Sequence, residues 1–243
     1  MRHIIFILLA LCCIKTNAEI TLFEQANREY KNENYSQAIN LYNNIITNNM
    51  ESSEIYYNLG NCYYKQKEWA NAIWNYEKSL QLKKNKKTLQ NLELTQLRII
   101  DKIELIPELF YTRWWKNTVD LFTTKTWQIF LLAIIWIICI LEIINKLISY
   151  KRKNLIIFLS IITIILSFIN YSSYTRNHTN KKAIIFASTV TVKSAPTTNS
   201  KNLFSLHSGT KISIIDNVED WINIQISDGK SGWIKKSTCK SIQ

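Results

Sequence analysis

The chain has 243 residues and a formal net charge of +12 at pH 7. Such a charge often indicates nucleic acid or anionic lipid as a partner. With only 4 Gly and 2 Pro, and with many Ile, Asn and Lys residues, the charge instead fits the diffuse lysine content that an AT-rich genome produces, and no nucleic-acid partner is predicted. Two apolar runs in the middle of the chain predict a membrane hairpin between two soluble parts.

Residues 1–18 have the pattern of a secretion signal. Arg2 provides the positive start, an apolar stretch of eleven residues follows, and Ala18 ends a cleavage site. The stretch is too short to span a bilayer, so cleavage is predicted; lipid attachment at Cys12 or Cys13 is the alternative. The three cysteines that remain lie in three different parts of the chain, and neither a disulfide framework nor a metal site is predicted.

Residues 19–100 contain a sequence repeat with a period of 34. Ala26, Tyr30, Tyr35, Ala38 and Tyr42 recur as Gly60, Tyr64, Trp69, Ala72 and Tyr76. This spacing resembles the tetratricopeptide repeat, whose units are pairs of antiparallel helices. Gly60 and Ala72 are small enough to let two helices approach closely. A solenoid usually needs about three units, so residues 88–100, which have apolar residues at near-helical spacing, are predicted to form a capping helix.

The resemblance to the tetratricopeptide repeat also locates a candidate groove, because the first helix of each unit lines the concave face. The predicted groove residues are Asn27, Tyr30, Lys31, Tyr57, Asn61, Tyr64 and Lys65. Asn side chains can pair with a peptide backbone in both directions, and Lys can bind a carboxylate. We therefore expect an extended peptide or the tail of a partner. The alternative is that these are solvated helix positions without a ligand.

Residues 101–125 are predicted to form an amphipathic juxtamembrane segment, because aromatic and basic residues cluster after Pro107 at a spacing that suits a helix at headgroup level. The alternative is that these rings pack on the capping helix. Residues 126–148 and 155–174 are apolar and long enough to form two transmembrane helices. The connection over 149–154 is a basic loop, which favours the cytoplasm.

Residues 183–243 change to the alternating pattern of β-strands. The order of their turn and core signals, with Asp228-Gly229 as a hairpin turn, resembles a bacterial SH3 domain. Trp221 and Trp233 form a candidate ligand face for a wall peptide or glycan. The alternative is that both are packing residues, because a barrel of about 60 residues has few apolar residues to spare.

The predicted fold class is multi-domain: all-α tetratricopeptide hairpins, two transmembrane helices and a small all-β SH3-like barrel. This order, with Asp101-Lys-Ile-Glu104, Pro107-Glu108 and Arg113-Trp-Trp-Lys116, resembles the BatE family of the Bacteroides aerotolerance operon. The resemblance implies an inner-membrane protein that binds other Bat-type proteins in an envelope complex. Both the signal and the basic loop place the two soluble parts in the periplasm.

The leading functional hypothesis is a membrane-anchored adaptor that binds protein partners through the groove, without a cofactor or metal. One alternative is an envelope sensor or wall-binding protein that uses the SH3 domain. Another is an SH3-targeted hydrolase, which requires a nucleophile with a base or a metal cluster. His178 and His207 have no partner at ligand spacing, so no enzymatic activity is predicted.

Overall fold

The computed structural model describes residues 22–103, 109–148, 153–179 and 181–242. The expected signal over 1–18 lies outside these ranges, as does most of the expected loop over 149–154. The chain divides into two compact units. The first combines Met1–Glu104 with Lys182–Gln243, and the second is Leu105–Lys181.

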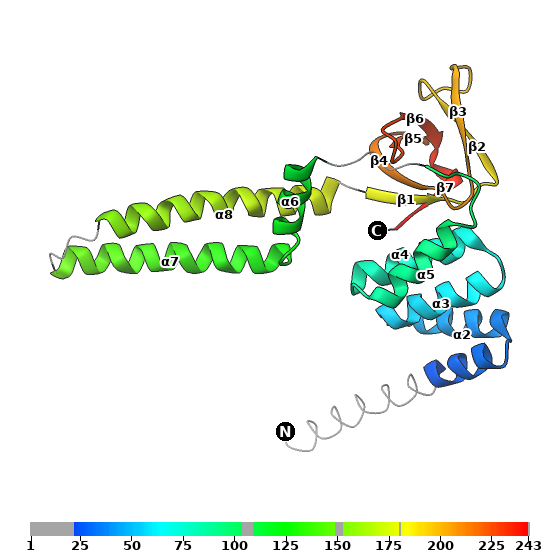
Figure 1. Cartoon of the computed structure of the whole chain (residues 1–243), viewed down its shortest axis with the longest axis horizontal. Coiled ribbons are helices and arrows are strands. Elements are labelled where there is room, and N and C mark those ends of the chain that lie inside the picture. Colours follow the sequence, from blue (N-terminus) through cyan, green and yellow to red (C-terminus); the bar gives the residue numbers. More distant parts are fainter. Residues whose placement is uncertain (1–21, 104–108, 149–152, 180, 243) are drawn as a thin grey trace, which may run out of the picture. The chain divides into compact units, whose positions relative to one another are not determined.

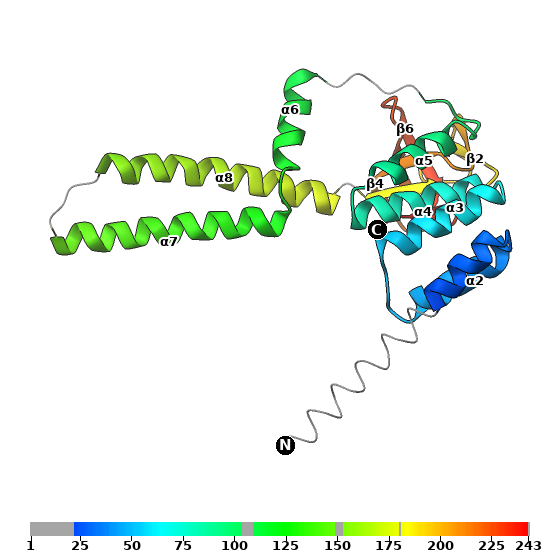
Figure 2. The ribbon, with the colours of Figure 1, turned by 60° about the horizontal axis from the view of Figure 1, so that its bottom comes forward.

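The N-terminal part of the first unit is helical. Residues 22–31 form a helix, which is followed by α2 (Tyr35–Thr47), α3 (Ser53–Lys65), α4 (Trp69–Leu82) and α5 (Lys86–Gln96). Helices α3, α4 and α5 lie side by side in both views (Figures 1 and 2). The Ser52 hydroxyl accepts a hydrogen bond from the backbone N–H of Ile55 at 3.2 Å, and this cap begins α3.

The turns within the two helical hairpins have the same geometry, 34 residues apart. Glu33 and Lys67 both have φ of 63°, a left-handed conformation that reverses the chain within a few residues. The following N–H groups of Asn34 and Glu68 donate to carbonyl oxygens five residues earlier, at 2.9 and 3.0 Å. The backbone therefore repeats with the period that the side-chain pattern predicted.

Small residues set the distance between the paired helices. Gly60 of α3 and Ala72 of α4 are buried. A Cβ atom added to Gly60 would lie 2.5 Å from two ring atoms of Tyr76, which is far inside van der Waals contact. The Tyr76 ring therefore occupies the space that the missing side chain leaves, as the close approach of the helices requires.

Helix α5 differs from the expected capping helix over 88–100, because it begins at Lys86 and ends at Gln96. Of the apolar residues at near-helical spacing, Leu89 and Leu97 are 46% and 63% exposed. The side chain of Asn85 starts the helix early by accepting a hydrogen bond from the N–H of Lys87 at 2.8 Å. The buried face of α5 consists of Thr88, Leu92 and Thr95.

The C-terminal part of the first unit is an antiparallel sheet. Its strands are β1 (Lys181–Ile185), β2 (Thr189–Lys193), β3 (Asn202–His207), β4 (Lys211–Val218), β5 (Trp221–Gln225), β6 (Ser231–Lys235) and β7 (Cys239–Ser241), with a 3₁₀ turn, η1 (Lys236–Thr238), before β7. The strand order is β3-β2-β6-β5-β4-β1-β7. Gly229 has φ of 86° in the turn between β5 and β6, so the predicted hairpin at Asp228-Gly229 is confirmed.

The sheet and the helices of the first unit share a core. Ile184 of β1 and Ile242 are fully buried against a cluster that includes Ile73 and Tyr76 of α4 and Leu92 of α5. A second cluster fills the interior of the SH3 sheet itself. The terminal pair of helices is thus covered by β-structure from the other end of the chain, which supplies the apolar cover that two repeats lack.

The second unit contains α6 (Phe110–Val119), α7 (Thr124–Ile148) and α8 (Lys153–Thr179). The stretches Thr124–Leu147 and Asn154–Thr175 have mean hydropathies of 2.5 and 2.3, and only 6% of the most apolar 18-residue window in each is buried. Helices α7 and α8 run alongside each other (Figures 1 and 2). They are long and apolar enough to cross a membrane, and their exposed apolar side chains indicate membrane association.

Candidate partner-binding groove

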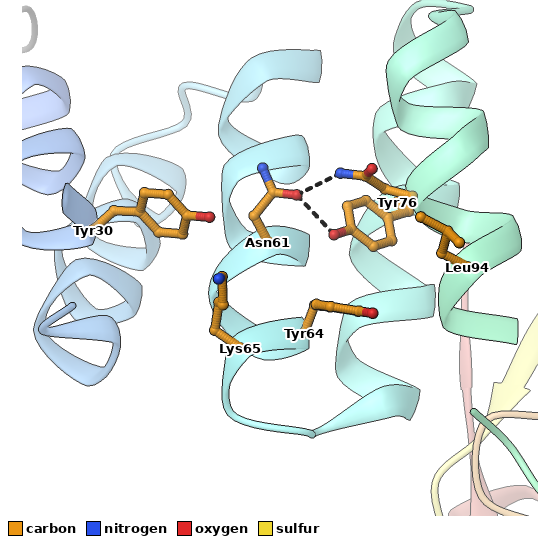
Figure 3. A pocket seen from close by; sticks show the side chains of 7 residues that line it. Tyr30, Asn61, Tyr64, Lys65, Tyr76 and Leu94 are labelled. Carbon is orange, nitrogen blue, oxygen red and sulfur yellow. Dashed lines mark hydrogen bonds between the residues drawn. The ribbon is translucent and has the colours of Figure 1, made fainter. Parts of the chain in front are cut away.

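A cavity of about 190 Å³ opens on the helical part of the first unit (Figure 3). Its walls come from the helix over 22–31, from α3, from α4 and from α5. The lining residues are Tyr30, Asn61, Tyr64, Lys65, Tyr76, Asn91 and Leu94. Phenol, amide, ammonium and apolar groups therefore meet in one hollow, a combination that can hold a peptide by both its backbone and its side chains.

The amide of Asn61 has a fixed orientation in this cavity. Its Oδ1 accepts hydrogen bonds from the Tyr76 hydroxyl at 2.8 Å and from Nδ2 of Asn91 at 2.9 Å. Figure 3 shows both bonds on one side of Asn61 and its nitrogen on the other side. Among the described residues no acceptor bonds this nitrogen, so its two N–H groups are available to a backbone carbonyl of a ligand.

The same arrangement occurs in the preceding repeat. Oδ1 of Asn27 accepts from the Tyr42 hydroxyl at 2.5 Å and from Nδ2 of Asn58 at 2.9 Å. Burial raises the pKa of Tyr42 and of Tyr76 above the usual value, so both phenols are neutral donors near pH 7. The tyrosine and asparagine side chains thus form a recurrent internal frame that holds the first helices of successive repeats.

Lys65 supplies the positive charge of the cavity. Its side chain is exposed, as is that of Lys31 one repeat earlier. Neither ammonium forms an ion pair within the described part of the chain. A carboxylate at the mouth of the cavity would therefore find an uncompensated cation, and this favours an acidic side chain or a chain terminus as one element of the ligand.

The predicted groove residues fall into two groups. Tyr30, Asn61, Tyr64 and Lys65 line the cavity. The other three predicted residues, Asn27, Tyr57 and Lys31, are not part of its lining. Asn27 is instead held in the internal frame, Tyr57 packs its ring 6.2 Å from that of Tyr76, and Lys31 is exposed.

Three lining residues were missed from the sequence. In the sequence Tyr76 is only a residue that recurs with the repeat, and Asn91 and Leu94 belong to α5, for which only a capping role is predicted. The sequence spacing does contain a signal for Asn91. It follows Asn61 by 30 residues, nearly the separation of 31 residues between Asn27 and its partner Asn58 in the preceding repeat. Helix α5 therefore takes the position that the first helix of a third repeat would have.

Trp221 and Trp233 lie on neighbouring strands of the SH3 sheet and are half-buried. Asn223 is directly opposite Trp233, and Trp221 is opposite Lys235. Because side chains alternate along a strand, these four residues share one face. The core residues Ile222, Ile224 and Ile234 point to the other face. The two indoles thus lie outside the sheet core, on the face where a ligand could contact them.

A second polar cluster joins the end of the helical part to the SH3 sheet. The Asp101 carboxylate accepts hydrogen bonds from the backbone N–H of His207 at 2.6 Å, from the Thr210 hydroxyl at 2.5 Å and from Nδ1 of His207, here assigned as the donor, at 2.7 Å. Burial acts to raise the pKa of Asp101, but these bonds outweigh it and hold the pKa below its usual value. No spacing or motif in the sequence indicates this partner of His207.

Two known protein families match parts of this chain. The tetratricopeptide repeat family matches residues 53–86, which correspond to α3, α4 and the start of α5. The bacterial SH3 domain family matches residues 188–239, which include β2 to β6. No curated protein matches the sequence of this chain. The chain therefore contains a tetratricopeptide region at its N-terminal side and a bacterial SH3 domain at its C-terminal side.

Proposed function

We propose that this protein is a membrane-anchored adaptor whose tetratricopeptide groove binds an extended segment of a protein partner. The observation that carries the proposal is the amide of Asn61, fixed by Tyr76 and Asn91 beside the uncompensated ammonium of Lys65. A preorganised donor next to a cation binds a peptide backbone and a carboxylate together. Such a site requires no catalytic group.

Both soluble parts belong on the same side of the membrane in this proposal. Ile184 and Ile242 share a core with α4, so the SH3 sheet and the helices form one body, which a membrane cannot divide. The expected signal sequence and basic loop favour the periplasm. The order of parts supports an assignment to the BatE type, with other Bat-type envelope proteins as partners.

Co-purification from native membranes tests the groove. We expect Lys65→Glu to lower recovery of the principal partner at least tenfold, because the substitution places a carboxylate where the ligand has one. Lys87→Glu makes the same charge change on an exposed lysine of α5 outside the cavity and should leave recovery unchanged. Full recovery with Lys65→Glu would show that the partner binds elsewhere.

The SH3 face supports a second candidate function, the binding of a wall fragment. Trp221 and Trp233 share the outer face of β5 and β6 with Asn223, whose Oδ1 is buried and accepts no hydrogen bond from the described residues. Two indoles on the same face as an amide suit a sugar or a short peptide. Binding of the full chain to isolated cell walls should then fall in Trp233→Ala and stay unchanged in Lys65→Glu.

We also propose that the protein has no hydrolytic activity. His207 is bound to Asp101, but among the described residues no serine or cysteine side chain hydrogen-bonds its ring, so a nucleophile is missing from this pair. The described residues also hold no group of three His, Cys, Asp or Glu side chains that could bind a metal ion. Turnover of peptidoglycan or ester substrates that disappears in His207→Ala would contradict this proposal.

A further inference from the structure

The exposed face of α6 is a surface that the adaptor function does not use. Phe110, Tyr111 and Trp114 are 84%, 55% and 65% exposed, and the adjoining Leu109 is 59% exposed. The opposite face of the helix is packed, and Val119 is only 2% exposed. A continuous aromatic surface of this kind on a firmly packed helix indicates a binding partner.

Helix α6 is held to the apolar helices by its packed face. The indole of Trp115 donates from Nε1 to the hydroxyl of Ser172 on α8 at 3.1 Å, and its ring centroid lies 5.4 Å from that of Phe168. The indole of Trp127 on α7 donates to the carbonyl oxygen of Val119 at 3.0 Å. The position of α6 on the hairpin is therefore fixed by contacts with both long helices.

The direction of α6 distinguishes it from α7 and α8. In both views α6 runs across the end of the hairpin, whereas the other two helices run along it (Figures 1 and 2). The apolar stretches begin at Thr124 and end at Thr175 at this same end. A helix that crosses the spanning helices where their apolar stretches end lies in the plane of the bilayer surface, where aromatic rings are favoured.

Basic side chains accompany the exposed rings. Arg113 lies between Tyr111 and Trp114 in sequence and is exposed, and Lys125 at the start of α7 is exposed as well. Neither forms an ion pair with a described residue. A guanidinium group at headgroup level binds phosphate through paired hydrogen bonds, so this surface is complementary to lipids with a net negative charge.

We propose that the exposed face of α6 binds the interfacial layer of a bilayer that contains anionic phospholipid. Phe110, Tyr111 and Trp114 lie among the upper acyl carbons and the glycerol groups, and Arg113 contacts phosphate. This inference rests on the proposed anchoring of the chain by α7 and α8. It adds a lipid contact that sets the depth and rotation of the hairpin, since α6 cannot turn without breaking its bonds to Ser172 and Trp127.

Fluorescence quenching by brominated phospholipids tests the contact in the full chain reconstituted at one copy per nanodisc. Subtracting the emission of a Trp→Phe variant from that of the wild type isolates one indole. Trp114→Phe reports on α6, Trp136→Phe on the exposed surface of α7, and Trp221→Phe on the SH3 sheet. We expect bromine near the headgroups to remove at least half of the Trp114 signal, bromine deep in the chains to quench Trp136, and neither to quench Trp221.

The quenching of the three indoles distinguishes a wrong lipid contact of α6 from a wrong assignment of the membrane anchor. Quenching of Trp136 without quenching of Trp114 would overturn the lipid contact and leave the anchor intact. An unquenched Trp136 would contradict the anchor itself. At equal bromine content, brominated phosphatidylglycerol should quench Trp114 at least twice as strongly as brominated phosphatidylcholine, and Arg113→Gln should abolish that difference. Equal quenching by both lipids would overturn the anionic preference.

Discussion

The indole of Trp74 on α4 donates a hydrogen bond from Nε1 to the carbonyl oxygen of Ser241, 2.8 Å away and 167 residues later in the chain. The ammonium of Lys240 lies 3.6 Å from the centroid of the same ring. Strand β7, to which both partners belong, is the last strand in the sheet order. The edge of the SH3 sheet is therefore covered by the tetratricopeptide region, which removes an open edge as well as an exposed helix face.

Asp101→Asn should weaken the contact between the end of the helical part and the SH3 sheet. The substitution removes the charge and one acceptor oxygen from a site with three donors, which costs on the order of 1 to 3 kcal/mol. Hydrogen exchange of the full chain should rise at His207 to Thr210 and in β1, and stay unchanged in α7. Unchanged exchange at these positions would show that the apolar contacts alone hold the SH3 sheet to the helical part.

The same variant has a defined pH dependence. The pKa of Asp101 is lowered in the folded protein, so its stabilising contribution is present above the unfolded value of about 3.9 and is lost as the pH falls through the lower folded value. The difference in unfolding free energy between wild type and Asp101→Asn should therefore begin to shrink below about pH 4 and disappear only when the pH lies below the folded pKa. Urea unfolding at several pH values measures it, and a difference that persists at full size at pH 2 would contradict the assignment.

Gly60→Ala should destabilise the helical region. In an open helix this change stabilises by up to about 1 kcal/mol. Here the added Cβ would lie 2.5 Å from the Tyr76 ring, which cannot swing away because Asn61 holds its hydroxyl. We expect a loss of about 1 to 3 kcal/mol in urea unfolding. A gain in stability would contradict this expectation, because it would mean that the helices can move apart to make room for the added Cβ atom.

Asn61 and Lys65 should behave differently although they are one helical turn apart. Asn61→Ala removes the acceptor of a buried hydroxyl and should cost about 1 to 3 kcal/mol. Lys65→Ala changes an exposed side chain and should stay within about 0.5 kcal/mol, while weakening partner binding. Melting curves and co-purification of both variants give the comparison. Equal melting temperatures for both would contradict the frame role of Asn61.

Reporter fusions test the side of the membrane on which the soluble parts lie. Fusions after Ile100 and after Gln243 should both report export, because the two parts form one body. A cytoplasmic signal from both would reverse the orientation and leave the shared core intact. Opposite signals from the two fusions would contradict the shared core.

The sequence predicted the local architecture well, for identifiable reasons. Helix packing demands small residues at contact points, so the recurrence of Ala26 as Gly60 revealed the helical hairpins. Two-residue strand turns with positive φ favour glycine, so Asp228-Gly229 revealed a strand hairpin. Both signals depend on residues that are close in sequence or related by a fixed period.

Contacts between distant segments were not predictable in this way. The packing of Ile184 and Ile242 against α4 is one such contact, because alternation shows which face of a strand is apolar but not which element covers it. Asp101 and His207 are 106 residues apart, and no periodicity relates them. Asn91 was missed for a similar reason, since its role depends on α5 replacing a helix of a repeat that the sequence does not complete.

The order of synthesis gives the shared core a further consequence. Helix α4 leaves the ribosome long before Ile184 and Ile242 exist, so its apolar face has no cover while the rest of the chain is still being translated. Ile184 and Ile242 complete this core only once the last strand has been synthesised. A chain that stops before residue 182 should therefore lose the protease resistance of its helices along with its SH3 domain, and equal resistance of the shortened and full-length chains would show that the helices mature alone.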